Sequence, residues 1–257
     1  VIVDARVGGG GELAERARAL GIRVENGTAI SKVFGKKRVE AIRICEHKDS
    51  GKGNEKIECD CIAMSGGWSP VVHLYSHCGG KLKWDEKMAL FKPDSSAKPT
   101  SHDGLPFVTA VGSANGFLLL QEVLKDAWEG CLNVIEATGG KVKKKSFKVI
   151  EQEYENSLQA IWIAPDDADI KKRSKIWLDF QNDVKINDVE LAAREGFESV
   201  EHAKRYTTLG MATDQGKLSN INGLAVLSSS LGKEIPKVGT TTFRPPYTPI
   251  SLGSIGG

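Results

Sequence analysis

Hydrophobic positions near the start of the chain predict a strand, a helix and a second strand. Apolar residues fill positions 1–3 and the run ends at Asp4, whereas residues 12–20 carry apolar side chains at helical spacing until Gly21. The second strand is predicted at residues 22–24, where apolar side chains flank an arginine. A strand, a helix and a strand at this spacing are typical of the second half of a dinucleotide-binding βαβ unit.

Asp4 stands at the end of the first predicted strand, where an acid in a dinucleotide-binding unit often binds a ribose hydroxyl. The glycine fingerprint that should precede such an acid by about 20 residues is not found in this sequence. Two interpretations of Asp4 therefore stay open. It is either a nucleotide ligand or a solvated acid at a strand end, and the second is the more common case.

Three further segments predict antiparallel strands, at residues 29–33, 39–45 and 56–64. The third strand leads into Ser65, Gly66 and Gly67, and Pro70 follows. A buried strand followed by two glycines brings bare backbone beside a ligand at the carboxyl end of a sheet. This segment resembles the second nucleotide-contact segment of the two-dinucleotide flavoprotein family, so we expect Gly66 and Gly67 to contact a nucleotide.

Residues 106–112 predict another strand, and residues 118–137 predict an amphipathic helix. Gly112 ends the predicted strand, and Ser113, Ala114 and Asn115 follow it. These four residues are the candidate ligands. Free N–H groups at a helix start can bind a pyrophosphate or a ribose. In the flavoprotein family that this segment also resembles, the strand ends in Gly-Asp and the acid meets the ribityl chain of the flavin. Ser113 replaces that acid, which argues against FAD at this place.

The last third of the chain predicts a small helical unit. Asn187 and Ser199 are the expected N-caps of two helices, and a third helix carries Leu224 at its apolar positions. A loop at residues 207–217, rich in glycine and small polar residues, precedes the third helix. Two glycines in such a loop indicate backbone that is turned sharply or held close to another group.

An extended strap follows at residues 239–249, because its prolines exclude a helix and a central strand. Thr241, Thr242 and Arg244 could bind a phosphate or a carboxylate through their hydroxyl and guanidinium groups. The strap could equally lie on a neighbouring domain without any ligand.

Composition and charge narrow the class of protein. With 257 residues, 40% apolar and 26% charged, the chain is expected to fold as one large or two modest soluble domains. Its formal net charge of +2 gives no electrostatic case for nucleic acid or an anionic membrane. Five cysteines without framework spacing favour reduced thiols in a cytoplasm. Because the chain starts on a strand and ends without a closing element, we expect it to be a piece of a longer polypeptide.

No metal site is predicted. His73, His77 and Cys78 have helical spacing, but no fourth ligand is evident and a pair of glycines follows at once.

Five blocks of sequence together resemble the alpha subunits of heterotetrameric sarcosine oxidases. The blocks are residues 59–74, 79–85, 179–184, 205–217 and 239–249. The resemblance implies an α/β fold that is the C-terminal part of a two-dinucleotide-binding, flavoprotein-reductase-like fold plus a small helical module. It divides the chain into an FAD/NAD(P)-binding-like domain truncated at its N-terminus (1–140), a linker (141–172) and a helical module with its strap (173–257).

The helical module also resembles the small [2Fe–2S] module of bacterioferritin-associated-ferredoxin type in related amine and opine dehydrogenases. Asp179, Gln181, Asp214 and Ser219 stand at the positions of its four cysteines. Because clusters of this type are held by cysteine thiolates, we predict no cluster in this chain.

The resemblance implies an oxidative demethylation of sarcosine to glycine, with the one-carbon unit passed to tetrahydrofolate and peroxide formed. It implies NAD in this chain at Gly66, Gly67 and the four residues from Gly112, and FMN at the interface with the beta subunit near Thr241, Thr242 and Arg244. FAD and tetrahydrofolate would lie elsewhere in a complex with beta, gamma and delta subunits, with the substrate on the beta subunit. The chain would hold no catalytic residue and would be inactive alone.

Two alternatives remain open from the residues. The chain is an alpha subunit of another amine or opine oxidase, although the replaced cluster cysteines count against the opine branch. Otherwise it is a scaffold that docks a catalytic subunit while its own nucleotide site stays empty.

Overall fold

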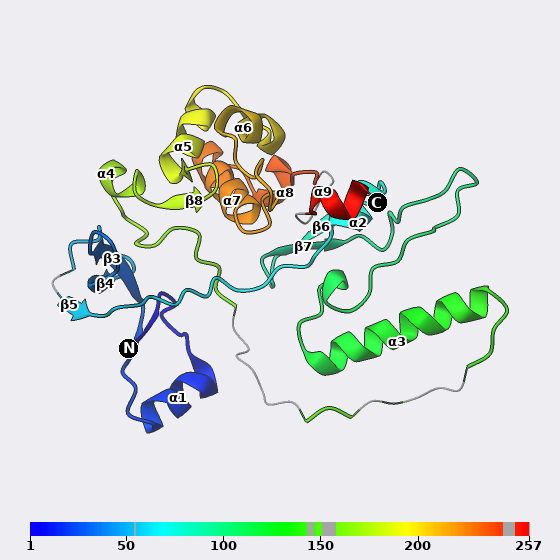
Figure 1. Ribbon diagram of the computed structural model, residues 1–257, viewed down its shortest axis with the longest axis horizontal. Helices are drawn as coiled ribbons and strands as arrows, with labels where there is room; N and C mark the ends of the chain where they lie inside the picture. The colour runs from blue at the N-terminus through cyan, green and yellow to red at the C-terminus, as the bar shows by residue number, and fades with distance from the viewer. Residues whose placement is uncertain (54, 143–145, 147, 151–157, 244–249, 257) are drawn as a thin grey trace.

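The structure is a computed structural model that describes residues 1–53, 55–142, 146, 148–150, 158–243 and 250–256 (Figure 1). The chain begins with the predicted βαβ unit. Strand β1 (Ile2–Asp4) pairs in parallel with β2 (Val24–Asn26), and helix α1 (Gly11–Ala19) connects them. The helix packs through Ala14 and Ala17, which are buried. The prediction of a strand, a helix and a parallel strand is confirmed.

The predicted antiparallel strands form a three-stranded sheet in the order β3-β4-β5. Their bounds are Thr28–Phe34 for β3, Ala41–Glu46 for β4 and Glu55–Glu58 for β5. The central strand β4 is buried at Ala41, Ile42, Ile44 and Cys45.

Two of the expected strands are shorter or missing. Strand β5 ends at Glu58, opposite the first residue of β4, so the ladder has no partner for the expected extension to residue 64. Residues 106–112 make only an isolated bridge between Thr100 and Pro106, among the residues that the structure describes. Both predictions of a buried strand before a glycine segment are wrong, because apolar sequence makes a strand only where a neighbour supplies hydrogen bonds.

The middle of the chain forms a hairpin and a long helix. Strands β6 (Leu82–Asp85) and β7 (Leu90–Pro93) pair antiparallel, with Trp84 and Phe91 in edge contact at 5.0 Å between ring centroids. A 3-10 turn, η1 (Gly112–Asn115), precedes helix α3 (Leu120–Ala137). Helix α3 packs on η1 but buries none of its own side chains in the described structure.

The last part of the chain is a helical module. It contains α4 (Ile170–Arg173), β8 (Trp177–Asp179), β9 (Val184–Lys185), α5 (Ile186–Arg194), α6 (Val200–Thr207), α7 (Asn220–Leu231), α8 (Ile235–Val238) and α9 (Leu252–Gly256). Its core gathers around α7, which is buried from Gly223 to Ser228. The other core residues come from β8, β9, α5, α6, the loop before α7, and α8, and they include Leu178, Ile186, Val189, Val200 and Val238.

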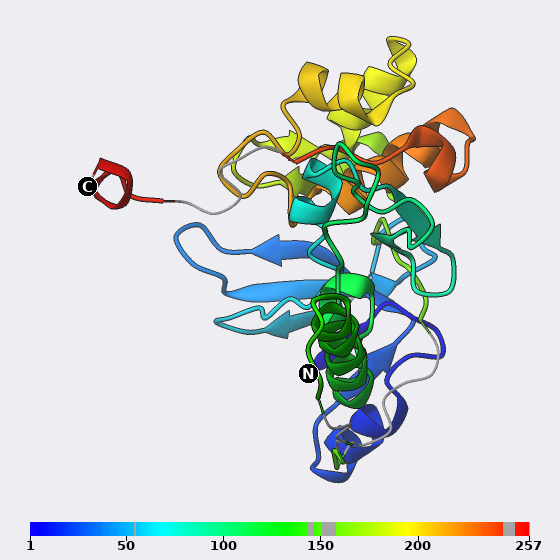
Figure 2. The ribbon, with the colours of Figure 1, turned by 90° about the vertical axis from the view of Figure 1, so that its right-hand side faces the viewer.

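Segments from the first half of the chain pack on this module. Phe91 of β7 lies against the module's core. Helix α2 (His73–His77) lies beside it as well, since the His73 and Phe243 rings are 4.0 Å apart between centroids. Figure 1 shows the β6-β7 hairpin beside the orange helix α8, and the end of the β3-β4-β5 sheet reaches the module as well, since His47 after β4 lines a pocket together with Ala225 of α7 (Figures 1 and 2).

Candidate functional site

Gly66 and Gly67 lie between β5 and α2, in an exposed stretch that is neither helix nor strand. Gly67 has φ of +97°, a left-handed conformation that favours glycine. A Cβ built on either residue would meet no described atom within 4 Å. The backbone of both glycines is therefore open to a ligand, and no side chain of the described structure covers it.

Gly112, Ser113, Ala114 and Asn115 form the η1 turn at the foot of α3. The N–H of Gly112 donates to the Asp126 carboxylate at 2.6 Å, and the Asn115 amide donates to the same carboxylate at 3.3 Å. The η1 amide expected to be free is thus engaged by a negatively charged side chain. Such a carboxylate disfavours a pyrophosphate at Gly112, because like charges repel, but it tolerates a neutral ring or a ribose.

Asp4 is engaged within its own turn. Its carboxylate accepts hydrogen bonds from the backbone N–H of Arg6 at 3.0 Å and from the Arg6 guanidinium at 2.7 Å. Burial alone would raise the pKa of Asp4, but the bonds from Arg6 outweigh it and hold the pKa below its usual value. The carboxylate stays ionised and bound to Arg6, so a ribose hydroxyl would have to compete with a guanidinium.

The strap places its two candidate threonines differently. Thr241 is 1% exposed, and its hydroxyl accepts a hydrogen bond from the Asn220 amide at 2.7 Å. Thr242 is exposed, and its backbone N–H donates to Glu201 at 2.7 Å. Arg244 lies outside the described residues. Of the described candidates of this strap, Thr242 is therefore the exposed one and Thr241 the buried one.

The loop at residues 207–217 is organised by Asp179. The carboxylate of Asp179, 3% exposed, accepts the backbone N–H of Gln181 at 2.9 Å, of Asn182 at 3.1 Å and of Gly210 at 2.8 Å. It thereby ties the β8-β9 turn to a loop some thirty residues further along.

The other three positions compared with cluster cysteines lie in the loop or beside it. Gln181 accepts from the Thr213 hydroxyl at 2.9 Å, and Asp214 accepts from the Gly216 N–H at 3.1 Å. Ser219 is 2% exposed. None of these side chains is a thiolate, so the set does not fit an iron–sulfur cluster.

Asn220 fills the space beneath this loop. A Cβ built on Gly210 or Gly216 would lie 2.1 Å from its Oδ1, so both positions require glycine for space as well as for their positive φ. The loop's glycines therefore close over a side chain of the protein itself.

The structure brings some of the predicted site segments together. The tilted ring contact between His73 and Phe243 joins the segment that follows Gly67 to the strap at Thr242 and Phe243. Burial and the nearby charge of Lys217 lower the pKa of His73, so this ring is held neutral. No hydrogen bond or ring contact among the described residues links the η1 turn to the strap.

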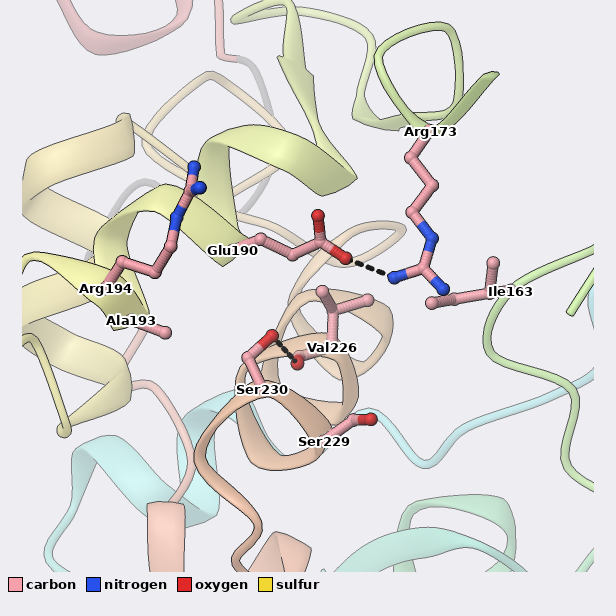
Figure 3. A pocket seen from close by; sticks show the side chains of 8 residues that line it. All are labelled: Ile163, Arg173, Glu190, Ala193, Arg194, Val226, Ser229 and Ser230. Atoms are coloured by element: carbon pink, nitrogen blue, oxygen red, sulfur yellow. Dashed lines mark hydrogen bonds and ion pairs between the residues drawn. The ribbon is translucent and has the colours of Figure 1, made fainter. Parts of the chain in front are cut away.

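A cavity of about 430 Å³, which the sequence did not indicate, lies between α5, α7 and the segment around Ile163 (Figure 3). Arg173 and Glu190 form an ion pair at its wall, and Ser229 and Arg194 also line it. Its charged groups come from α4 (Arg173) and α5 (Glu190 and Arg194), and the rest of the lining comes from α7 and the segment around Ile163. Only the tertiary structure brings these separate elements together.

In the described part of the chain, no group of three or more His, Cys, Asp or Glu side chains is placed to hold a metal ion. No described helix is both long and apolar enough to cross a membrane.

Comparison with known proteins gives the chain's relationship. Residues 173–257 match the family model of the sarcosine oxidase A3 domain. The whole chain is 37% identical, over 259 residues, to the sarcosine oxidase subunit alpha of Rhizobium meliloti (strain 1021). The chain is a relative of the sarcosine oxidase alpha subunits. The subunit alpha of Corynebacterium sp. (strain P-1) is 31% identical over 269 residues and also matches 100% of this chain. The resemblance drawn from the sequence blocks is confirmed.

This relative of the alpha subunits spans about a quarter of their length, 24% and 26% of the two proteins. Its fold is similar to that of L-proline dehydrogenase from P. horikoshii, with a TM-score of 0.64, 20% identity, and coverage of 94% of this chain and 47% of that one. The likeness shows a shared mixed α/β fold.

Proposed function

We propose that this chain is part of the alpha subunit of a sarcosine oxidase, an oxidoreductase that demethylates sarcosine to glycine. The observation that supports this proposal is that the whole of this chain is similar to sarcosine oxidase alpha subunits, at 37% and 31% identity. The one-carbon unit would pass to tetrahydrofolate, and reoxidation of the flavin by oxygen would give peroxide. The chain contributes binding surfaces and no catalytic residue, so alone it does not turn over sarcosine.

Within the subunit, this chain is proposed to bind NAD at Gly66 and Gly67. Their exposed backbone, with open space at both Cβ positions, fits the close approach of a nucleotide's phosphates. Because Asp126 occupies the Gly112 amide, the contacts of Ser113, Ala114 and Asn115 are assigned to an uncharged part of the nucleotide.

The strap is proposed to face the FMN at the interface with the flavin-bearing beta subunit. Thr242 offers an exposed hydroxyl, and Arg244 would supply a charge suited to a phosphate. Thr241 acts as a positioning residue, since its hydroxyl is used inside the module by Asn220.

The test uses the complete oxidase complex, with the bound nucleotides released and identified by mass spectrometry. The Gly67→Val complex is expected to contain no NAD, because the added side chain blocks the approach of the nucleotide to the backbone. Gly79→Val is a matched control, since Gly79 also has a positive φ, +93°, and open space at its Cβ. Retention of NAD in the Gly67→Val complex contradicts the placement, and the finding of FAD in the alpha subunit contradicts the interpretation of Ser113.

A second candidate is a scaffold whose nucleotide site is empty. Two groups that a nucleotide would use are already satisfied, Asp4 by Arg6 and the Gly112 amide by Asp126. The scaffold predicts an assembled, active complex from which no NAD can be released. An alpha subunit of another amine oxidase predicts NAD release with a different amine as substrate.

A further inference from the structure

One face of the β3-β4-β5 sheet carries three positive charges directly opposite one another. Lys32 of β3 pairs in register with Arg43 of β4, and Arg43 pairs in register with Lys56 of β5. These three residues, called here the cationic row, therefore run straight across all three strands. Directly opposed side chains point to the same side of a sheet and lie about 4.5–5.5 Å apart at their Cβ atoms.

Phe34 lies in the middle of these charges. The Lys32 Nζ lies 4.8 Å, the Arg43 Cζ 5.2 Å and the Lys56 Nζ 5.4 Å from the centroid of its ring. Each contact with the ring is worth only about 0.5–1 kcal/mol at an exposed site. The ring gathers the cations without neutralising them.

No carboxylate neutralises the cationic row in the described part of the chain. None of the three side chains makes an ion pair there, and the Nε of Arg43 is shielded from solvent without a hydrogen-bond partner. By contrast, Arg23 beside the same sheet pairs with Glu55 of β5 and with Glu25. Carboxylates therefore neutralise Arg23 beside the sheet, whereas the cationic row has no such partner among the described residues.

The β3-β4 loop adds more positive charge at the same end of the sheet. Lys36, Lys37 and Arg38 are all exposed in this loop. Gly35, with φ of +127°, makes the turn possible, since a Cβ there would lie 1.9 Å from the Arg38 carbonyl oxygen. The loop geometry is therefore fixed locally, close to the cationic row.

Like charges directly opposite one another destabilise a sheet, so an ordinary solvated face favours alternating signs. A row of three cations is stabilised when an acidic partner covers it. Phe34 at its centre is half-buried and supplies the aromatic contact that protein interfaces favour together with arginine.

We propose that the cationic row and Phe34 dock an acidic surface of another subunit of the oxidase complex. This inference rests on the proposed function, because it requires that the chain works in a multi-subunit enzyme. A protein surface is favoured over nucleic acid, since the charge is confined to one small sheet of a chain whose net charge is only +2.

The test measures the affinity of the complete alpha subunit for the remaining subunits, expressed together, as a function of NaCl concentration. Lys32→Glu combined with Lys56→Glu is expected to weaken binding at least about tenfold at 0.15 M salt, with a much smaller difference at 1 M. Lys98→Glu combined with Lys125→Glu, two exposed lysines outside the row, is the control and is expected to bind as the wild type does.

Lys32→Gln combined with Lys56→Gln removes charge without reversing it, and it is expected to give a smaller loss with a shallower salt dependence. It serves in place of the reversal if the glutamates prevent folding, as judged by circular dichroism. Equal affinity and salt dependence in the row and control variants would overturn the inference. Binding of wild-type chain to duplex DNA that the row variant loses, with unchanged assembly, would overturn it too. If the wild-type subunits do not assemble at all, the proposed function fails instead.

Discussion

The carboxylate of Asp179 holds two loops of the helical module together. It is nearly fully buried and accepts three backbone N–H groups, one of them from Gly210 across the module. Hydrogen bonds to a charged acceptor are stronger than neutral ones, and their donors are costly to leave unpaired. The Asp179 carboxylate therefore cross-links the β8-β9 turn to the loop at residues 207–217.

Asp179→Asn is expected to lower the free energy of unfolding by roughly 2–4 kcal/mol, because one carboxylate oxygen becomes an amide that cannot accept. Urea unfolding followed by circular dichroism measures it. Asp183→Asn is the control in the same turn: Asp183 is exposed, and asparagine tolerates its positive φ of +55°. Equal stability of the two variants would show that Asp179 is not the cross-link.

At Gly216, glycine is favoured for two reasons: the positive φ of the backbone and the lack of space for a Cβ atom. Gly216→Ala is expected to destabilise the module by roughly 1–3 kcal/mol more than Gly196→Ala does. Both glycines have positive φ, +75° and +90°, but only at Gly216 would a Cβ collide with Asn220. Thermal unfolding of both variants measures the difference, and a difference near zero would mean that Asn220 moves aside freely.

At the scale of elements, α2 is docked on the strap through an aromatic pair. His73 is buried against Phe243, and its pKa is lowered by burial and by Lys217. The folded chain therefore binds fewer protons than the unfolded chain just below the unfolded pKa of about 6.5. The stabilising contribution of the neutral ring is complete above that value and is lost as the pH falls through it toward the folded pKa.

We expect the free energy of unfolding to fall between about pH 7 and pH 5.5, and His73→Gln to flatten this part of the pH profile. His77→Gln, at the exposed end of the same helix, should leave the slope of the profile unchanged. Urea unfolding at a series of pH values gives both profiles. An unchanged slope in His73→Gln would assign the pH dependence to another group.

At the scale of the whole molecule, helix α3 has an apolar stripe without a partner in the described structure. Leu120, Cys131 and Val134 are exposed, and their spacing places them along one side of the helix. The chain spans only about a quarter of its relatives' length. Under the proposed function, we expect other parts of the alpha subunit to cover this stripe.

Thiol labelling tests whether the stripe on α3 is exposed in this chain alone and covered in the complete alpha subunit. In this chain alone, Cys131 should react quickly and Cys45 slowly, because Cys45 is buried and burial is the main cause that raises its pKa. In the complete alpha subunit, Cys131 should become slow as well, whereas Cys45 should not change. Mass spectrometry of timed samples gives both rates, and a Cys131 that stays equally reactive would leave the stripe exposed.

Sequence alone determined those elements whose signal is local. The βαβ unit, the three antiparallel strands, the helix after residue 118 and the helices of the module follow from periodicity. The prediction of Asn187 as an N-cap is wrong, because α5 begins at Ile186 with Lys185 as its N-cap, and Asp188 accepts the N–H of Lys185 at 2.8 Å. The resemblance to sarcosine oxidase alpha subunits followed from sequence blocks, and the comparisons confirm it. The domain boundaries, the nucleotide ligands and the cluster-like origin of the module stay predictions.

Tertiary structure decided what depends on a neighbour distant in the sequence. It ended β5 at Glu58 and left residues 106–112 without a ladder, because a strand needs hydrogen-bond partners that no local pattern reveals. It engaged Asp4 with Arg6 and the Gly112 amide with Asp126, and it turned the hydroxyl of Thr241 inward. A sequence shows which polar groups are present, but only packing decides which of them are already satisfied and which remain to bind another molecule.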